Sequence, residues 1–250
     1  MSRFRDKVVI VTGAGSGIGR AAALKLASEG AHVVVADIKG HDAIAGEIAA
    51  SGGRALALTT DVRKAADITN LVAQTVAHFG RLDLAFNNAG IAQTNRAPLP
   101  DLDETTWSNI MDTNLRSVFL CMKHQIPAML ASGGGAIVNT SSGVVPHGYT
   151  NISIYVASKA GVDALTRVAA MEFAGRGIRI NAINPGFTAT PMLDGVIPKA
   201  DQPRLAEMTP LKKLTTAEDA ANAALFLLSP DAGHITGQSL YVDGGIGVAF

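Results

Sequence analysis

The chain has 250 residues, 48% of them hydrophobic, and its 21 basic residues are balanced by 21 acidic ones. This length fits one large α/β domain or at most two small ones, and the hydrophobic fraction is sufficient for a sheet buried on both faces. A formal net charge of zero argues against a nucleic-acid-binding protein, which normally carries a basic excess, but it does not exclude a small anionic ligand.

Signals for export or membrane insertion are missing from the start of the sequence. Only four apolar residues follow Lys7 before Thr12, whereas a signal peptide needs about 7–15 apolar residues and a membrane span about 20. Cys121 is the only cysteine, so the chain can form no internal disulfide, which is compatible with a reducing cytoplasm. We expect a cytoplasmic protein with no membrane partner and no nucleic-acid partner.

Short apolar runs alternate with helical stretches along the chain. Strands are predicted at residues 8–11, 32–36, 55–58, 82–86, 136–140, 178–183 and 239–242. Helices are predicted at residues 17–30, 42–50, 65–79, 107–130, 154–174 and 217–228. Continuous apolar strands separated by helices are typical of βαβ units in a parallel sheet. Because no linker, repeat or low-complexity tract divides the chain, residues 1–250 are predicted to form one α/β domain.

Residues 186–210 are the least regular segment and contain four prolines. A loop of this length inside a compact domain is usually functional, and it often covers a site. An irregular helical excursion without a role is the alternative.

A glycine-rich turn joins the first predicted strand to the first helix. Gly13, Gly17 and Gly19 allow a sharp turn, expose backbone N–H groups to a pyrophosphate and let the helix pack closely on the sheet. The positive end of the helix adds to the attraction for phosphate. The G-x-x-x-G-x-G spacing differs from the common G-x-G-x-x-G pattern, because Ile18 takes the last glycine place. An ordinary strand-to-helix turn remains the alternative.

Asp37 ends the second predicted strand, 18 positions after Gly19. In a doubly wound fold this carboxylate lies near the adenosine ribose and accepts hydrogen bonds from its hydroxyl groups. It also repels a 2′-phosphate, and neither Ser16 nor Ile38 supplies a compensating cation, so NAD is predicted over NADP. Lys39 is the one nearby residue that could weaken this preference, and a simple turn aspartate is the alternative.

Tyr155 and Lys159 are four residues apart and therefore share one face of a predicted helix. A phenol normally keeps its proton until about pH 10, but a nearby ammonium and the positive charge of an oxidised nicotinamide favour the phenolate. Such a phenolate can take a proton from an alcohol near neutral pH. Ser142 follows a strand and can donate a hydrogen bond to the substrate oxygen. Y-x-x-x-K is common on surface helices and becomes specific only beside Ser142 and the glycine-rich turn.

Together these features resemble those of the short-chain dehydrogenases/reductases, in the group with subunits of about this length. The resemblance extends from Lys7 to Gly245 and rests on four motifs in a fixed order: T-G-x-x-x-G-x-G at Thr12–Gly19, N-N-A-G at Asn87–Gly90, Y-x-x-x-K at Tyr155–Lys159 and P-G-x-x-x-T at Pro185–Thr190. It implies a single doubly wound Rossmann-type domain, with a seven-stranded parallel sheet, three helices on each face and the site at the carboxyl ends of the strands.

The resemblance also implies the catalytic roles. Ser142 would orient the substrate oxygen, Tyr155 would act as general acid/base, and Lys159 would bind the nicotinamide ribose and assist Tyr155. Asn114 would hold a water in a proton relay through a distortion of the long helix, and asparagine is a poor residue for a helix interior. Ser141 competes for the serine role, but Ser142 has the family spacing of 13 residues to Tyr155.

The cofactor is predicted to be NAD, and no metal site is expected. By the resemblance, Asp61 and Val62 would contact the adenine ring, whereas Thr190 and the backbone near Thr188 would hold the nicotinamide carboxamide. The full set of predicted cofactor-binding residues is Gly13, Ser16, Gly17, Ile18, Gly19, Asp37, Ile38, Asp61, Val62, Asn88, Ala89, Gly90, Tyr155, Lys159, Pro185, Gly186, Thr188 and Thr190.

The predicted reaction is reversible hydride transfer between NAD(H) and a secondary alcohol or its ketone. Residues 92–97, 144–152 and 186–210 would line the substrate pocket with mainly apolar side chains and no clustered arginines, which argues against strongly anionic substrates such as acyl-carrier conjugates. Three alternatives stay open: an NADP-dependent carbonyl reductase, a sugar epimerase or dehydratase of the same superfamily, and a dinucleotide-sensing protein on the same scaffold.

A homotetramer is predicted, built partly on the helices at residues 107–130 and 154–174. The second helix carries small residues, which permit close approach of two helices, at Ala157, Ala160, Gly161 and Ala164. Members of the family are commonly dimers or tetramers, so the resemblance points the same way. The alternative is that these alanines reflect helix propensity alone.

Overall fold

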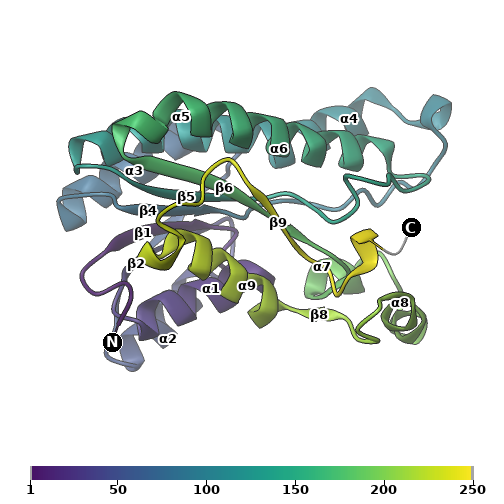
Figure 1. Cartoon of the computed structure of the whole chain (residues 1–250), viewed down its shortest axis with the longest axis horizontal. Helices are drawn as coiled ribbons and strands as arrows, with labels where there is room; N and C mark the ends of the chain where they lie inside the picture. The colour runs from purple at the N-terminus through teal and green to yellow at the C-terminus, as the bar shows by residue number, and fades with distance from the viewer. Residues whose placement is uncertain (1, 249–250) are drawn as a thin grey trace.

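The computed structural model describes residues 2–248, so the outermost residues of the predicted 1–250 domain lie outside the described part. Its centre is a seven-stranded sheet with the order β3-β2-β1-β4-β5-β6-β9 (Figure 1). The strands are β1 (Val8–Thr12), β2 (His32–Asp37), β3 (Arg54–Thr59), β4 (Leu84–Asn87), β5 (Gly135–Thr140), β6 (Ile178–Pro185) and β9 (Ser239–Val242). All the pairings in this sheet are parallel, which confirms the predicted α/β class.

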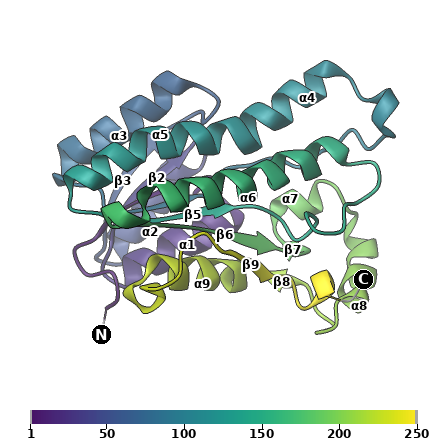
Figure 2. The same ribbon diagram turned by 45° about the horizontal axis from the view of Figure 1, so that its top comes forward.

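Helices cover both faces of the sheet, as predicted (Figure 2). One face packs against α1 (Gly17–Ser28), α2 (His41–Ala50) and α9 (Ala217–Leu228). The other packs against α3 (Ala65–Phe79), α5 (Ser117–Ala131) and α6 (Ser153–Phe173). The chain first winds from β1 outward to β3 and then returns to β4 on the other side of β1. This reversal places a crevice at the carboxyl ends of β1 and β4, where doubly wound folds bind ligands.

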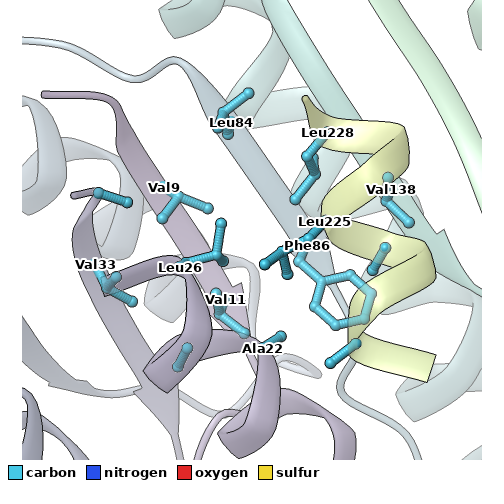
Figure 3. Close-up of a cluster of buried hydrophobic side chains, with 14 of the residues drawn as sticks. Val9, Val11, Ala22, Leu26, Val33, Leu84, Phe86, Val138, Leu225 and Leu228 are labelled. Atoms are coloured by element: carbon cyan, nitrogen blue, oxygen red, sulfur yellow. The ribbon is translucent and has the colours of Figure 1, made fainter. Parts of the chain in front are cut away.

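Alternate residues of the central strands enter opposite hydrophobic cores. Val9 and Val11 pack in the core beneath α1 and α9, whereas Ile10 packs in the core on the opposite face. Figure 3 shows Leu26 of α1 and Leu225 of α9 meeting the strand side chains in the first core. Because both faces are covered, these strands are continuous apolar runs, which is why the sequence pattern located them.

The predicted helix at residues 107–130 is present, and it contains a π-helical turn. The structure has α4 (Glu104–Met111), then a π-helical turn (Asp112–Arg116), and then α5. Asn114 lies in the middle of this turn, so the expected distortion of the helix is present. Turns of this type are rare and often occur at functional sites.

The prediction of an irregular segment at residues 186–210 is wrong in part. The segment contains β7 (Thr188–Ala189), which pairs with β8 (Thr215–Thr216), and two short helices, α7 (Pro191–Asp194) and α8 (Gln202–Met208). Pro191 and Pro203 lie in the first turns of these helices. At that position the missing N–H of proline breaks no helical hydrogen bond.

No helix within residues 2–248 is both long enough and apolar enough to cross a bilayer. The one cysteine, Cys121, is buried in α5, and burial raises the pKa of its thiol to about 12. A thiol with so high a pKa is a packing residue and not a nucleophile.

Candidate active site

A cavity of about 940 Å³ lies at the carboxyl ends of the central strands. Its volume is in the range of small-molecule sites, about 300–1,000 Å³. The structure brings most of the predicted site residues to its wall. Gly19 and Asn114 are the predicted residues that do not line it, and those that do are Gly13, Ser16, Gly17, Ile18, Asp37, Ile38, Asp61, Val62, Asn88, Ala89, Gly90, Ser142, Tyr155, Lys159, Pro185, Gly186, Thr188 and Thr190.

The glycine-rich turn between β1 and α1 needs its glycines. Gly13 and Gly17 have φ angles of 66° and 53°, a region that favours glycine. A Cβ on Gly13 would lie 2.8 Å from the Ala89 Cα, and one on Gly19 would collide with the Gly13 carbonyl oxygen. The turn is therefore packed tightly against the chain after β4. Its backbone and the start of α1 form a suitable site for a pyrophosphate.

Thr12 ties the glycine-rich turn to the N-N-A-G motif. Its Oγ1 accepts hydrogen bonds from the backbone N–H groups of Asn88 (3.1 Å) and Ala89 (3.2 Å). The Asn88 side-chain amide donates to the Thr12 and Gly13 carbonyl oxygens, both at 3.3 Å. These bonds connect the ends of β1 and β4, so the two motifs form one wall of the cavity. The sequence reading gave Thr12 no separate role.

Asp37 is hydrogen-bonded to the glycine-rich turn. One carboxylate oxygen accepts the Gly15 N–H at 2.9 Å, and the other accepts the Ile38 N–H at 2.7 Å. The carboxylate is thus fixed at the end of β2, on the cavity wall, before any ligand binds. The Asp61 carboxylate forms an ion pair with the Arg63 guanidinium at 2.7 Å, and this bond keeps the pKa of Asp61 below its usual value.

Lys159 is buried, with 3% of its surface exposed, and its Nζ donates to the Thr140 carbonyl oxygen at 2.8 Å. The ammonium lies 5.9 Å from the centre of the Tyr155 ring, so the two side chains meet as their spacing predicts. Burial lowers the pKa of Lys159 to about 8, and the negative charge of Asp163 opposes that shift. The ammonium is therefore hydrogen-bonded to a backbone carbonyl, and the negative charge of Asp163 favours its protonated form.

Burial dominates the proton affinity of Tyr155. It raises the pKa of the phenol above its ordinary value, and the Ser142 side chain lowers it only in part. The phenol on its own therefore keeps its proton. A shift towards the phenolate therefore needs positive charge near the ring, from the Lys159 ammonium and from an oxidised nicotinamide when one binds.

The two neighbouring serines have different environments. The Ser141 hydroxyl is buried and donates to the Lys159 carbonyl oxygen at 3.0 Å, so it supports the backbone of α6. The Ser142 oxygen accepts only a long bond, 3.4 Å, from the Val144 N–H within the described residues. Because the Ser142 side chain bonds to the Tyr155 phenol and not to the backbone of α6, Ser142 is the better candidate for binding a substrate oxygen beside the acid/base.

Asn114 fixes the π-helical turn to two other segments. Its side-chain oxygen accepts the Ile91 N–H at 2.8 Å, and its amide group donates to the Ile91 carbonyl at 2.9 Å and to the Ser158 hydroxyl at 3.3 Å. Asn114 is completely buried. It therefore connects the loop after β4 with Ser158 of α6, which lies three residues after Tyr155.

Comparison with known proteins decides the family. A family described as "Enoyl-(Acyl carrier protein) reductase" matches residues 13–247. Cyclohexanol dehydrogenase of Acinetobacter sp. (strain SE19) is 43% identical over 246 residues, which are 97% of this chain and 96% of that protein. The chain belongs to the short-chain dehydrogenase/reductase family.

Two further members of this short-chain dehydrogenase/reductase family are similar over nearly the full length. Cis-4-hydroxycyclohexanecarboxylate dehydrogenase of Sinomonas cyclohexanicum is 43% identical over 243 residues, 97% of each chain. The solved structure of a 7α-hydroxysteroid dehydrogenase complexed with NADH and 7-oxo glycochenodeoxycholic acid has a TM-score of 0.92 and 33% identity, and covers 98% of this chain and 96% of that chain. Family members use nicotinamide dinucleotides, and the glycine-rich turn with Asp37 fits such a group.

The sequence analysis gave no role to Asp163, a buried carboxylate one helical turn after Lys159. Asp163 accepts hydrogen bonds from the Asn184 side chain at 3.1 Å and from the Ser239 hydroxyl at 2.9 Å. It thereby ties α6 to β6 and β9. One signal was available: Asp163 stands four residues after Lys159 and so lies on the same face of the helix.

Proposed function

We propose that this protein is an NAD-dependent dehydrogenase that oxidises a secondary alcohol on a ring and reduces the corresponding ketone. The observation that carries the proposal is the meeting of Ser142, Tyr155 and Lys159 on the wall of a cavity that also contains the glycine-rich turn. The relatives named for cyclohexanol and hydroxycyclohexanecarboxylate support a ring alcohol. One domain would carry both the cofactor and the substrate, and we keep the cytoplasm as the expected compartment.

The nicotinamide, when bound, supplies the hydride acceptor or donor. The chain then has to orient the substrate and move one proton. The Ser142 hydroxyl donates to the substrate oxygen, and the Tyr155 phenolate takes the proton of the alcohol or, in reverse, the phenol returns it. The Lys159 ammonium stabilises the phenolate by Coulomb attraction and can donate to the ribose hydroxyls.

For the proton relay we propose a more specific role for Asn114. Both ends of the Asn114 amide are already bonded to Ile91 or Ser158. A relay water would therefore bind the main-chain carbonyl groups of the π-helical turn, where the i→i−4 bonding is interrupted. In this proposal Asn114 positions the turn, and the turn positions the water.

Asp37 should make NAD the preferred cofactor. The carboxylate meets any 2′-phosphate at the end of β2, and repulsion together with desolvation should cost about 1–3 kcal/mol, or about 5- to 150-fold in kcat/KM. We expect cyclohexanol oxidation to show this preference and Asp37→Ala to narrow it. Both cofactors are compared on the same substrate, with Asp42→Ala, an exposed carboxylate of α2, as the control.

One observation favours the alternative of an NADP-dependent carbonyl reductase. Lys39 and Arg63 also line the adenosine end of the cavity, and Lys39 is exposed. If kcat/KM is equal or higher with NADP, these cations outweigh Asp37 and the alternative is correct.

We further propose a homotetramer that uses the outer surfaces of α4, α5 and α6. Trp107, Phe119, Val168 and Met171 are large apolar side chains on these helices, each at least 47% exposed in the single chain. Burial of such side chains against a second copy is favourable. Light scattering should give about four times the chain mass of 25.8 kDa, and Met171→Glu should reduce the assembly. A mass near that of one chain contradicts the proposal. A mass of two chains supports a dimer with only one of the proposed interfaces.

A further inference from the structure

Three loops converge on the substrate side of the cavity, and one side chain from each packs against the next. Arg96 belongs to the loop after β4, Tyr149 to the loop after β5, and Phe187 follows β6. The Arg96 guanidinium carbon lies 6.0 Å from the centre of the Tyr149 ring, and that ring meets the edge of Phe187 at 6.3 Å and 84°. Because β4, β5 and β6 are neighbours in the sheet, their loops build one continuous wall. All three side chains line the cavity.

The charges on the cavity wall are unevenly distributed. Within residues 2–248, the carboxylates that line it are Asp37 and Asp61, and both follow strands at the adenosine end. On the substrate side the charged side chains of the described wall are Lys159, which the proposed function places in catalysis, and Arg96. Its guanidinium forms no ion pair and no hydrogen bond within the described residues, while six other arginines of this part do. The wall therefore presents one unneutralised positive charge.

We propose that Arg96, stacked on Tyr149, binds a carboxylate that the ring substrate carries away from the reacting alcohol. This inference rests on the proposed dehydrogenase function and adds a second recognition point to the same site. A guanidinium that stacks on an aromatic face keeps its N–H edge free, and that edge matches a carboxylate with two parallel hydrogen bonds. A single arginine suits a single carboxylate, which agrees with the sequence-based argument against strongly anionic substrates.

The groups around Arg96 leave its guanidinium available for an anionic group of the substrate. His147 is in the same loop as Tyr149, but its ring nitrogen bonds to the Gly247 carbonyl oxygen. The remaining wall of the substrate side is largely apolar, with Val144, Met192 and Leu193 available to the ring. Arg96 itself is exposed, so the apolar side chains are available to the ring of the substrate while the guanidinium stays accessible to its carboxylate.

The first test compares three substrates that share one ring: 4-hydroxycyclohexanecarboxylate, its methyl ester and cyclohexanol. Arg96→Met should lower kcat/KM for the carboxylate at least about tenfold, mainly through KM, because a charge-assisted bond is lost. The values for the ester and for cyclohexanol should stay within about twofold, since neither carries a charge for Arg96 to bind. Arg204→Met, an exposed arginine of α8 that does not line the cavity, is the matched control. Equal losses on all three substrates, or none on the carboxylate, overturn the proposal.

The second test needs no turnover. Cyclohexanecarboxylate is titrated into the enzyme–NADH complex and followed by NADH fluorescence or calorimetry. We expect saturable binding that weakens as salt is raised and is lost in Arg96→Met but partly kept in Arg96→Lys. Unchanged binding in Arg96→Met overturns the inference even if the enzyme oxidises cyclohexanol. Arg96-dependent binding without oxidation of any ring alcohol retains the subsite and rejects the proposed function.

Discussion

Replacing Tyr155 by phenylalanine should reduce turnover of a secondary alcohol by at least about 10²-fold, the lower end of what general acid–base catalysis contributes. The substitution removes the only phenol on α6 while it keeps the ring and its packing. Burial already holds the proton on this phenol, and phenylalanine has no hydroxyl group that could give or take it. The measurement is kcat at saturating cofactor and alcohol, for the oxidation and the reduction.

Cofactor binding by Tyr155→Phe should remain within about threefold of wild type, because we expect the backbone of the glycine-rich turn and Asp37 to provide most of the dinucleotide contacts. Tyr241→Phe, on β9 and outside the cavity lining, is the matched control and should keep its turnover. Turnover of Tyr155→Phe close to that of wild type would remove Tyr155 from the acid/base role.

Lys159→Met should damage both turnover and cofactor affinity, unlike Tyr155→Phe. We expect kcat to fall by at least about 10²-fold, because the phenolate loses its neighbouring positive charge, and the dissociation constant of NAD to rise about tenfold, because the ribose loses a donor. The substitution also leaves the Thr140 carbonyl oxygen without its 2.8 Å partner, so the melting temperature has to be recorded beside the kinetics.

Lys64→Met, which changes an exposed lysine outside the cavity lining, controls for loss of a positive charge. A Lys159→Met enzyme with wild-type affinity for NAD would restrict Lys159 to the proton transfer. An enzyme with wild-type turnover would exclude Lys159 from it altogether.

Most of the fold could be predicted because its signals are local. The helices at residues 65–79 and 217–228 and the last strand at 239–242 agree residue by residue with α3, α9 and β9. The π-helical turn could not be located by periodicity, since Asn114 is held by Ile91, 23 residues away. Prolines misled the reading of residues 186–210, because a proline begins a helix as readily as it interrupts one.

In the candidate site, too, residues in short-range patterns could be predicted and residues defined by long-range contacts could not. Glycine spacing and the four-residue step from Tyr155 to Lys159 are short-range patterns, and all the residues they indicate except Gly19 line one cavity. Asp163 was missed because its partners, Asn184 and Ser239, come from β6 and β9 and meet it only in the fold. Arg96 was passed over for a similar reason: a lone arginine gains significance only from the Tyr149 ring on which it lies.

The central claim is that this site moves a hydride between the carbinol carbon of a ring alcohol and a nicotinamide. Cyclohexanol with deuterium on the carbinol carbon tests it directly, when NAD is supplied and the reduced cofactor is analysed by mass spectrometry. We predict one deuterium in each NADH that forms and slower turnover than with unlabelled cyclohexanol. NADH without deuterium, or no reduced cofactor from cyclohexanol or 4-hydroxycyclohexanecarboxylate with either NAD or NADP, would contradict the claim.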